Sequence, residues 1–116
     1  MGRKTLKITQ WIIIVLLTLQ FLAAGVAKLA GVWNPMFEKW GYPSYFATII
    51  GILEVLSVIG LYPNKLRQYA LIVIGVIMLG AIYTHIMATE YVRIIHNIVL
   101  ILLAIVIYKI GKRLNK

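Results

Sequence analysis

Long stretches of uncharged, mainly apolar residues divide the chain into four segments. Residues 8–27, 68–89 and 94–108 contain no Asp, Glu, Lys or Arg, and residues 41–64 contain only Glu54. A helix of about 20 residues crosses a hydrocarbon core of roughly 30 Å. Because backbone groups in lipid must be hydrogen-bonded within their own segment, each stretch is predicted to be a helix although it is rich in Ile and Val. The expected spans are residues 9–30, 44–61, 69–88 and 94–110. The pattern therefore predicts an all-α fold, a transmembrane four-helix bundle that forms a single domain over residues 1–116.

The loop after the first span has a pattern of its own. Trp33, Phe37 and Trp40 are separated by four and three residues, which places them on one face of a helix. We expect a short interfacial helix in this first outer loop, lying on the outer leaflet. The alternative is that the same aromatic face forms a lid over polar residues of the bundle.

The composition is typical of a membrane protein. Of the 116 residues, 62% are hydrophobic and 13% are charged, whereas soluble domains have about 45–50% and about 25%. A soluble globule of this length has too much surface to bury so many apolar side chains. The absence of cysteine excludes disulfides, thiol catalysis and thiolate metal ligands. The sequence also lacks a Gly-rich phosphate loop and a Ser-His-acid set, so it indicates no enzyme class, no cofactor and no nucleic-acid partner.

Basic residues are concentrated on one side of the predicted bundle. The chain has twelve Lys and Arg residues and three acidic residues, which gives a net charge of +9. Nine of the basic residues lie in the two tails and the second loop, while Lys28, Lys39 and Arg93 lie on the other side. The positive-inside rule therefore places both termini in the cytoplasm. We expect a multi-pass protein of a bacterial-type inner cell membrane, whose anionic lipids attract basic segments.

The first span also has features of a secretory signal. It follows a basic N-terminal region, and Gly25-Val26-Ala27 resembles a cleavage site. Its apolar core is longer than the 7–15 residues typical of a signal peptide. We expect a retained helix, with cleavage as the alternative.

Glu54 is the strongest candidate for a functional residue inside the membrane. It lies close to the middle of the second span, where an acidic side chain costs around 2.5–3.5 kcal/mol on insertion scales. Ala47, Gly51 and Ser57 stand at helical spacing from it and would let another helix approach closely. We expect Glu54 to face the bundle interior with Gln20 as its partner. The alternative is a neutral carboxyl that only hydrogen-bonds a neighbouring helix.

Polar residues near the outer boundary are expected to converge above Glu54. They are Lys28 of the first span, His85 of the third, and His96 and Asn97 of the fourth. Together with Gln20 and Glu54 they form the candidate pocket for a ligand or a proton. The alternatives are that Lys28 extends into the headgroups and that the histidines make hydrogen bonds at the interface. A direct contact between Lys28 and Glu54 is not expected, since helical rise separates them by ~12 Å. A metal is not expected either, because the two histidines lack a third ligand.

Four short motifs follow one another over nearly the whole chain. They are Gly25-x-x-Lys28-Leu29, Trp40-Gly41-Tyr42-Pro43, Ile50-Gly51-x-x-Glu54 and Gly80-Ala81-x-x-Thr84-His85. In this order the chain resembles the DoxX-like family of small four-helix integral membrane proteins. The resemblance implies a four-helix bundle, and some relatives take part in thiosulfate:quinone oxidoreduction or in redox-stress complexes with partner proteins. Since this chain has no cysteine and no redox group, the oxidoreductase activity is not carried over.

The expected function is that of a DoxX-like membrane protein that binds a small apolar, quinone-like or lipid-like molecule in an outward-facing pocket. The same features also fit a membrane subunit of a redox-related complex. Expected partners are membrane lipid, the small molecule and a redox partner protein, and a homo-oligomer is left open. The alternative is a small proton-coupled multidrug-type transporter. That family carries its essential carboxylate in the first helix, whereas the first span here carries Lys28.

Overall fold

The computed structural model describes residues 2–43 and 45–114, and this part of the chain contains five helices. They are α1 (Arg3–Leu29), α2 (Asn34–Lys39), α3 (Tyr45–Gly60), α4 (Asn64–Met87) and α5 (Tyr91–Leu114). No strand occurs among the described residues, and the predicted all-α class is confirmed. Two residues used in the predictions lie outside the described part, namely Ser44 at the start of the second span and Lys116 in the basic tail.

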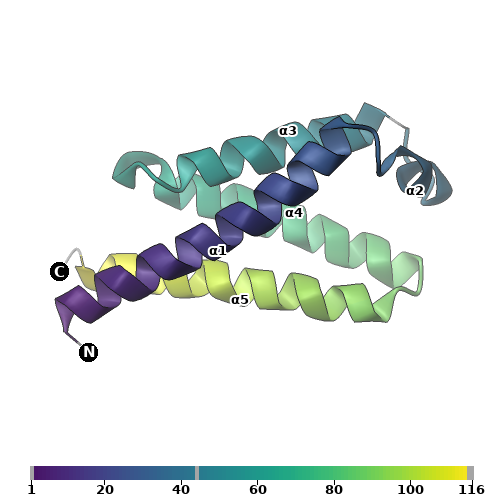
Figure 1. The fold of residues 1–116 in the computed structure, drawn as a ribbon. Helices are drawn as coiled ribbons and strands as arrows, with labels where there is room; N and C mark the ends of the chain where they lie inside the picture. The colour runs from purple at the N-terminus through teal and green to yellow at the C-terminus, as the bar shows by residue number, and fades with distance from the viewer. Residues whose placement is uncertain (1, 44, 115–116) are drawn as a thin grey trace.

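The two ends of the bundle contain different parts of the chain (Figure 1). At one end, here called the termini end, α1 begins and α5 finishes, and Arg3 Nη1 donates a hydrogen bond to the Leu114 carbonyl oxygen at 2.9 Å. At the other end, here called the α2 end, lie α2 and the turn of residues 88–90. Helix α1 packs against α3 and α5, and α4 packs against the same two helices. The four longer helices therefore form a ring in which each helix has two neighbours.

Three helices are long and apolar enough to cross a membrane. Helix α1 has 27 residues, and α4 and α5 have 24 each. Helix α3 has 16 residues, which corresponds to about 24 Å and is shorter than a typical hydrocarbon core. Three of the four predicted spans therefore have full length, and α3 is a shorter fourth apolar helix. A short span is accommodated when the surrounding bilayer thins.

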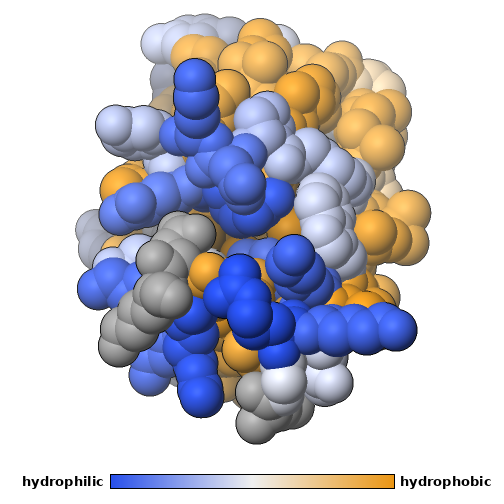
Figure 2. Space-filling view, turned by 90° about the vertical axis from the view of Figure 1, so that its left-hand side faces the viewer, coloured by the Kyte–Doolittle hydropathy of each residue, from blue (hydrophilic) through white to orange (hydrophobic). Residues whose placement is uncertain are grey.

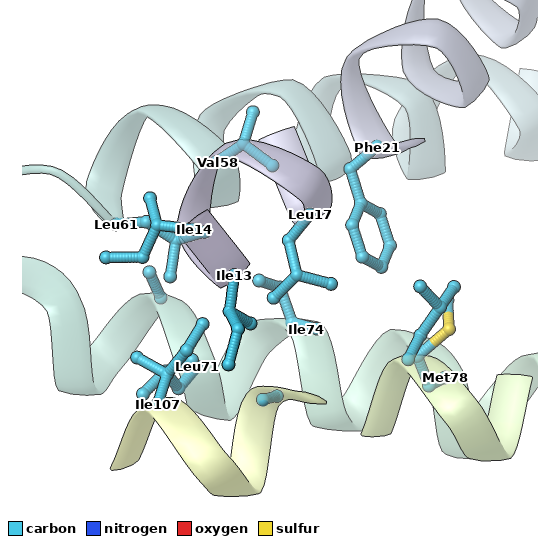
Figure 3. Packing of buried hydrophobic residues seen from close by; sticks show 13 residues of the cluster. Ile13, Ile14, Leu17, Phe21, Val58, Leu61, Leu71, Ile74, Met78 and Ile107 are labelled. Carbon is cyan, nitrogen blue, oxygen red and sulfur yellow. The ribbon is translucent and has the colours of Figure 1, made fainter. Parts of the chain in front are cut away.

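The bundle buries one apolar stripe of each long helix and exposes the rest. Ile14 and Leu17 of α1 pack with Val58 of α3 in the core (Figure 3). None of these three residues is more than 1% exposed. Leu19 and Leu79 on the outward faces are 62% and 63% exposed. Apolar surface of this extent would associate in water. In a bilayer the same side chains contact lipid tails, which agrees with a multi-pass membrane protein.

Helix α2 confirms that the first loop contains a short helix. Its Phe37 is buried, with ring centroids 5.3 Å from Trp40 and 6.1 Å from Phe46 of α3. The aromatic face of α2 therefore packs against α3, as expected for a lid, and the opposite side of α2 is exposed.

Candidate functional site

Helices α1 and α3 approach closely where two glycines face each other. A Cβ atom added to Gly25 would lie 3.0 Å from the Gly51 carbonyl oxygen, and one added to Gly51 would lie 2.9 Å from the Gly25 carbonyl oxygen. Real side chains do not sit this close to a backbone oxygen, so a larger residue at either position would push the helices apart. Two of the sequence motifs therefore meet at one helix crossing.

Next to this crossing, Lys28 of α1 and Glu54 of α3 form a buried ion pair. Lys28 Nζ lies 2.7 Å from Glu54 Oε1, and the two side chains are 13% and 3% exposed. The prediction that these residues are too far apart to touch is therefore wrong. The partner of Glu54 is therefore Lys28 and not Gln20 as predicted. Gln20 is half-buried on α1.

The direction of helical side chains explains the contact. The predicted separation of ~12 Å counted only the rise along the helices, but side chains also lean toward the N-terminus of their own helix. Because α1 and α3 run in opposite directions, Lys28 leans toward the termini end and Glu54 leans toward the α2 end. The two side chains thus converge. Gly51 leaves room for this, since a Cβ there would lie 3.0 Å from Lys28 Cβ.

Trp33, in the turn between α1 and α2, covers the ammonium group of the ion pair. Its ring centroid lies 5.3 Å from Lys28 Nζ and 5.3 Å from Arg93 Cζ of α5. The faces of aromatic rings attract cations, so Trp33 connects two helices that start or end at the α2 end. The ion pair is therefore enclosed by protein on this side.

A second polar cluster joins the segment after α2 to the end of α4. The Tyr42 hydroxyl lies 2.8 Å from Thr84 Oγ1, and Thr84 Oγ1 donates to the Gly80 carbonyl oxygen at 3.0 Å. Since the Thr84 proton is used for Gly80, Tyr42 is the donor to Thr84. The Tyr42 oxygen then keeps its capacity to accept a hydrogen bond from outside the chain.

Beside this hydroxyl pair, His85 is held between Trp40 and Glu90. His85 Nδ1 lies 3.0 Å from Glu90 Oε1, and the Trp40 and His85 rings meet edge-on with centroids 5.5 Å apart. The Trp40 indole nitrogen is buried and has no hydrogen-bond partner in the described part of the chain. The first loop therefore closes over His85 and keeps one donor unused.

A surface hollow of about 410 Å³ lies beside the second cluster. We call it the α2-end hollow, and its lining includes Lys39, Trp40, Tyr42, Thr84, Met87 and Glu90. Its volume falls in the range of about 300–1,000 Å³ that is usual for ligand sites. Lys28 and Glu54 do not line it. None of the six residues of the predicted pocket lines this hollow, so the ion pair, the predicted pocket residues and the hollow are separate features.

The four motifs thus meet in two pairs, one at the ion pair and one at the hydroxyl pair. A family model described as the DoxX-like family matches residues 12–107. The chain belongs to the DoxX-like family. No curated protein and no solved structure was found to match it. For this DoxX-like protein, the matched residues include all four motifs, and these motifs account for the contacts described above.

The remaining candidate residues of the DoxX-like protein lie in different environments. His96 of α5 is exposed and does not line the α2-end hollow. Asn97 is 6% exposed, and its Nδ2 atom is buried without a hydrogen-bond partner among the described residues. No three His, Asp or Glu side chains of residues 2–43 and 45–114 are grouped so that they could hold a metal ion. That all six candidate residues serve one ligand stays a prediction.

The sequence interpretation did not identify the residues of the hydroxyl pair as a site. Trp40 and Tyr42 are typical of the headgroup boundary, and this general role hides their contacts with α4. Thr84 stands beside His85 in the same motif, so a polar residue near the end of the third span was the feature of the sequence that could have indicated this site. Glu90 lies in the short turn between α4 and α5, where an acidic residue attracts no attention by itself.

Proposed function

We propose that this DoxX-like protein is a cell-membrane protein with four spanning helices and cytoplasmic termini, which binds a small quinone-like or lipid-like molecule at the α2 end. The single observation that carries the proposal is the α2-end hollow, which has the volume of a ligand site and is lined by residues of two family motifs. The Lys28–Glu54 pair has a supporting role, because it holds α1 against α3 beneath the first loop.

The groups around the hollow match the chemistry of a quinone and its hydroquinone. Lys39 is a donor suited to a carbonyl oxygen, while the Tyr42 oxygen and the Glu90 carboxylate are acceptors suited to hydroxyl groups. Met87 supplies an apolar contact surface at the same place. Ligand sites commonly combine apolar walls with a few polar groups of this kind.

A binding experiment with matched tyrosine variants tests the proposal. The protein in lipid nanodiscs is titrated with decylubiquinone, and binding is followed by quenching of tryptophan fluorescence, since Trp40 lines the hollow. Tyr42→Phe removes one hydrogen bond next to the ligand, and one such bond contributes about 0.5–1.5 kcal/mol. We therefore expect the Kd to rise about 3–10-fold.

Tyr62→Phe is the matched control. Tyr62 also pairs with a threonine, with 2.9 Å between its hydroxyl and Thr18 Oγ1, but it lies at the termini end. This variant is expected to bind like the unchanged protein. Equal effects of both variants, or the absence of saturable binding together with no co-purified quinone or lipid in native mass spectrometry, would contradict the proposal.

The other two functions predict different outcomes in the same preparation. A membrane subunit of a redox-related complex would co-purify with a partner protein in amounts that Tyr42→Phe leaves unchanged. A proton-coupled transporter would move a hydrophobic cation into proteoliposomes against a pH gradient. The structure offers less support for transport, because Glu54 is already engaged by Lys28.

A further inference from the structure

A second hollow, at the opposite end of the molecule, has a different chemical character. It has a volume of about 520 Å³ and lies between α1, α4 and α5 at the termini end. Four basic residues contribute to its lining, namely Arg3, Lys7, Arg67 and Lys112. Figure 2 looks at this end and shows hydrophilic side chains gathered there, with hydrophobic ones on the flank. We call this feature the termini-end hollow.

The positive charge of the termini-end hollow has no acidic side chain to balance it. The chain contains three acidic residues, Glu38, Glu54 and Glu90. The first lies in α2, the second pairs with Lys28, and the third contacts His85. None of them lines this hollow. An anion that enters it therefore meets four basic side chains and no acidic side chain in the lining.

Arg67 is held in position before any ligand arrives. Its guanidinium donates to the Leu61 carbonyl oxygen at 2.6 Å, to the Tyr62 carbonyl oxygen at 3.0 Å and to Asn64 Oδ1 at 2.8 Å. It also lies 5.3 Å from the Trp11 ring centroid. These contacts use three of the five N–H groups of an arginine, which leaves two for a ligand. A fixed guanidinium loses little entropy when it binds a phosphate.

The remainder of the lining is partly polar and partly apolar. Gln10 is 3% exposed, and its side-chain amide donates to the Ile107 carbonyl oxygen at 3.4 Å. Leu71 and Ile107 add apolar surface at the same place. Trp11, also in the lining, is 42% exposed on the side of α1. A free inorganic anion gains nothing from contact with this apolar surface, whereas a phospholipid carries a phosphate and apolar chains on one molecule.

We propose that the termini-end hollow binds the headgroup phosphate of an anionic phospholipid from the leaflet that surrounds this end. Basic pockets between membrane helices are suited to such headgroups. The site is independent of the α2-end hollow and of the ligand proposed there. It is also more specific than a general attraction of basic tails to a membrane, because it requires the residues that line the hollow.

Two matched double variants test this assignment. Lys7→Gln/Lys112→Gln removes two charges from the lining, and Lys4→Gln/Lys109→Gln removes two charges from the same two helices outside the lining. All four lysines are exposed, so both proteins are expected to fold, as helicity by circular dichroism will report. The full chain in a neutral detergent is titrated with dioleoyl phosphatidylglycerol, with dioleoyl phosphatidylcholine in a parallel series, and bound lipid is counted by native mass spectrometry.

The unchanged protein is expected to retain phosphatidylglycerol and to release phosphatidylcholine. With about 1 kcal/mol for each basic residue near the headgroup, the lining variant loses about 30-fold in affinity. The control variant stays within about 3-fold. Equal losses in both variants would show general charge attraction and overturn the proposal, as would equal binding of the two lipids.

Two further measurements distinguish a lipid bound in the hollow from free phosphate and from a lipid bound elsewhere on the surface. Inorganic phosphate at 10 mM is expected to leave bound phosphatidylglycerol in place, and its displacement would assign the site to free phosphate instead. Gly111→Leu fills the hollow without changing its charge, because a Cβ at Gly111 would lie 3.6 Å from Gln10 Nε2. This variant is expected to lose the lipid at full charge, and unchanged binding would contradict a site inside the hollow.

Discussion

Replacing Lys28 with methionine separates the contribution of the buried ion pair from that of its apolar contacts. Methionine keeps most of the unbranched stem and removes the ammonium group. In the native protein the Lys28 side chain is 13% exposed and the Glu54 side chain 3%, so neither charge is well solvated. Breaking a buried pair by removal of one partner typically costs about 3–5 kcal/mol, because the other charge is left uncompensated.

The free energy of neutralising the remaining carboxylate sets an upper limit on this cost. A carboxyl group with the reference pKa of about 4.3 takes up a proton at pH 7 for about 3.7 kcal/mol, and at pH 5 for about 1 kcal/mol. Lys28→Met is therefore expected to lower the free energy of unfolding by about 3 kcal/mol at pH 7 and by about 1 kcal/mol at pH 5. The stability of this variant falls as the pH rises, since neutralising Glu54 becomes more costly.

The double variant Lys28→Met/Glu54→Leu completes the test. Replacing a buried ion pair with apolar residues of similar size is often neutral or stabilising by about 1–4 kcal/mol. We expect the double variant to be at least as stable as the native protein at both pH values. Unfolding is measured by adding sodium dodecyl sulfate to the protein in dodecyl maltoside micelles and following the helical signal in circular dichroism. A double variant that is as unstable as Lys28→Met alone at pH 7, or a Lys28→Met variant with the same stability at pH 5 and pH 7, would refute the reasoning.

Two further predictions use the same preparation or intact cells. Gly51→Ala is expected to lower the free energy of unfolding by about 1–3 kcal/mol, because its Cβ would lie 2.9 Å from the Gly25 carbonyl oxygen. Gly75→Ala is the control, since nothing lies within 4 Å of its Cβ, and it is expected to stabilise the protein by about 0.5–1 kcal/mol. Similar values for both variants would argue against a tight crossing. The orientation of the helices is tested with a membrane-impermeant maleimide added to intact cells, which is expected to label Lys39→Cys and not Lys4→Cys. The native chain has no cysteine and gives no background labelling. Labelling of Lys4→Cys alone, or of both variants, would contradict cytoplasmic termini.

The sequence predicted the number and order of the long helices well, and their ends less well. Hydropathy identifies the part of a helix that lies in the hydrocarbon core, and a helix can continue beyond it. Helix α1 begins at Arg3 and not at residue 9, and α5 continues to Leu114 and not to residue 110. Charged and polar residues in these extra turns are compatible with the headgroup region. Helix α3 is instead slightly shorter than its predicted span, since proline and glycine lie near both of its ends and it has 16 residues.

The contacts of the candidate site were harder to predict than the helices. The small residues around Glu54 correctly indicated a close helix approach, and Gly25 and Gly51 form that crossing. The partner of Glu54 could not be found from depth alone, because depth refers to Cα atoms and the ion pair is made by side chains that lean toward each other. Contacts such as Tyr42 with Thr84 depend on how a loop folds back onto a helix, and no periodicity in the sequence reports that.

The distribution of charge indicates why the two hollows should take different ligands. The three acidic residues equal in number the three basic residues Lys28, Lys39 and Arg93, which lie outside the two tails and the second loop. Of the residues that line the α2-end hollow, Lys39 and Glu90 carry opposite charges, so a molecule that binds there needs no net charge, and a neutral quinone-like ligand fits. At the termini end, no acidic side chain accompanies the basic residues of the lining, so an anion from outside the chain is attracted there. An anionic lipid would supply it there, and the lysine variants measure whether it does so inside the hollow or only near it.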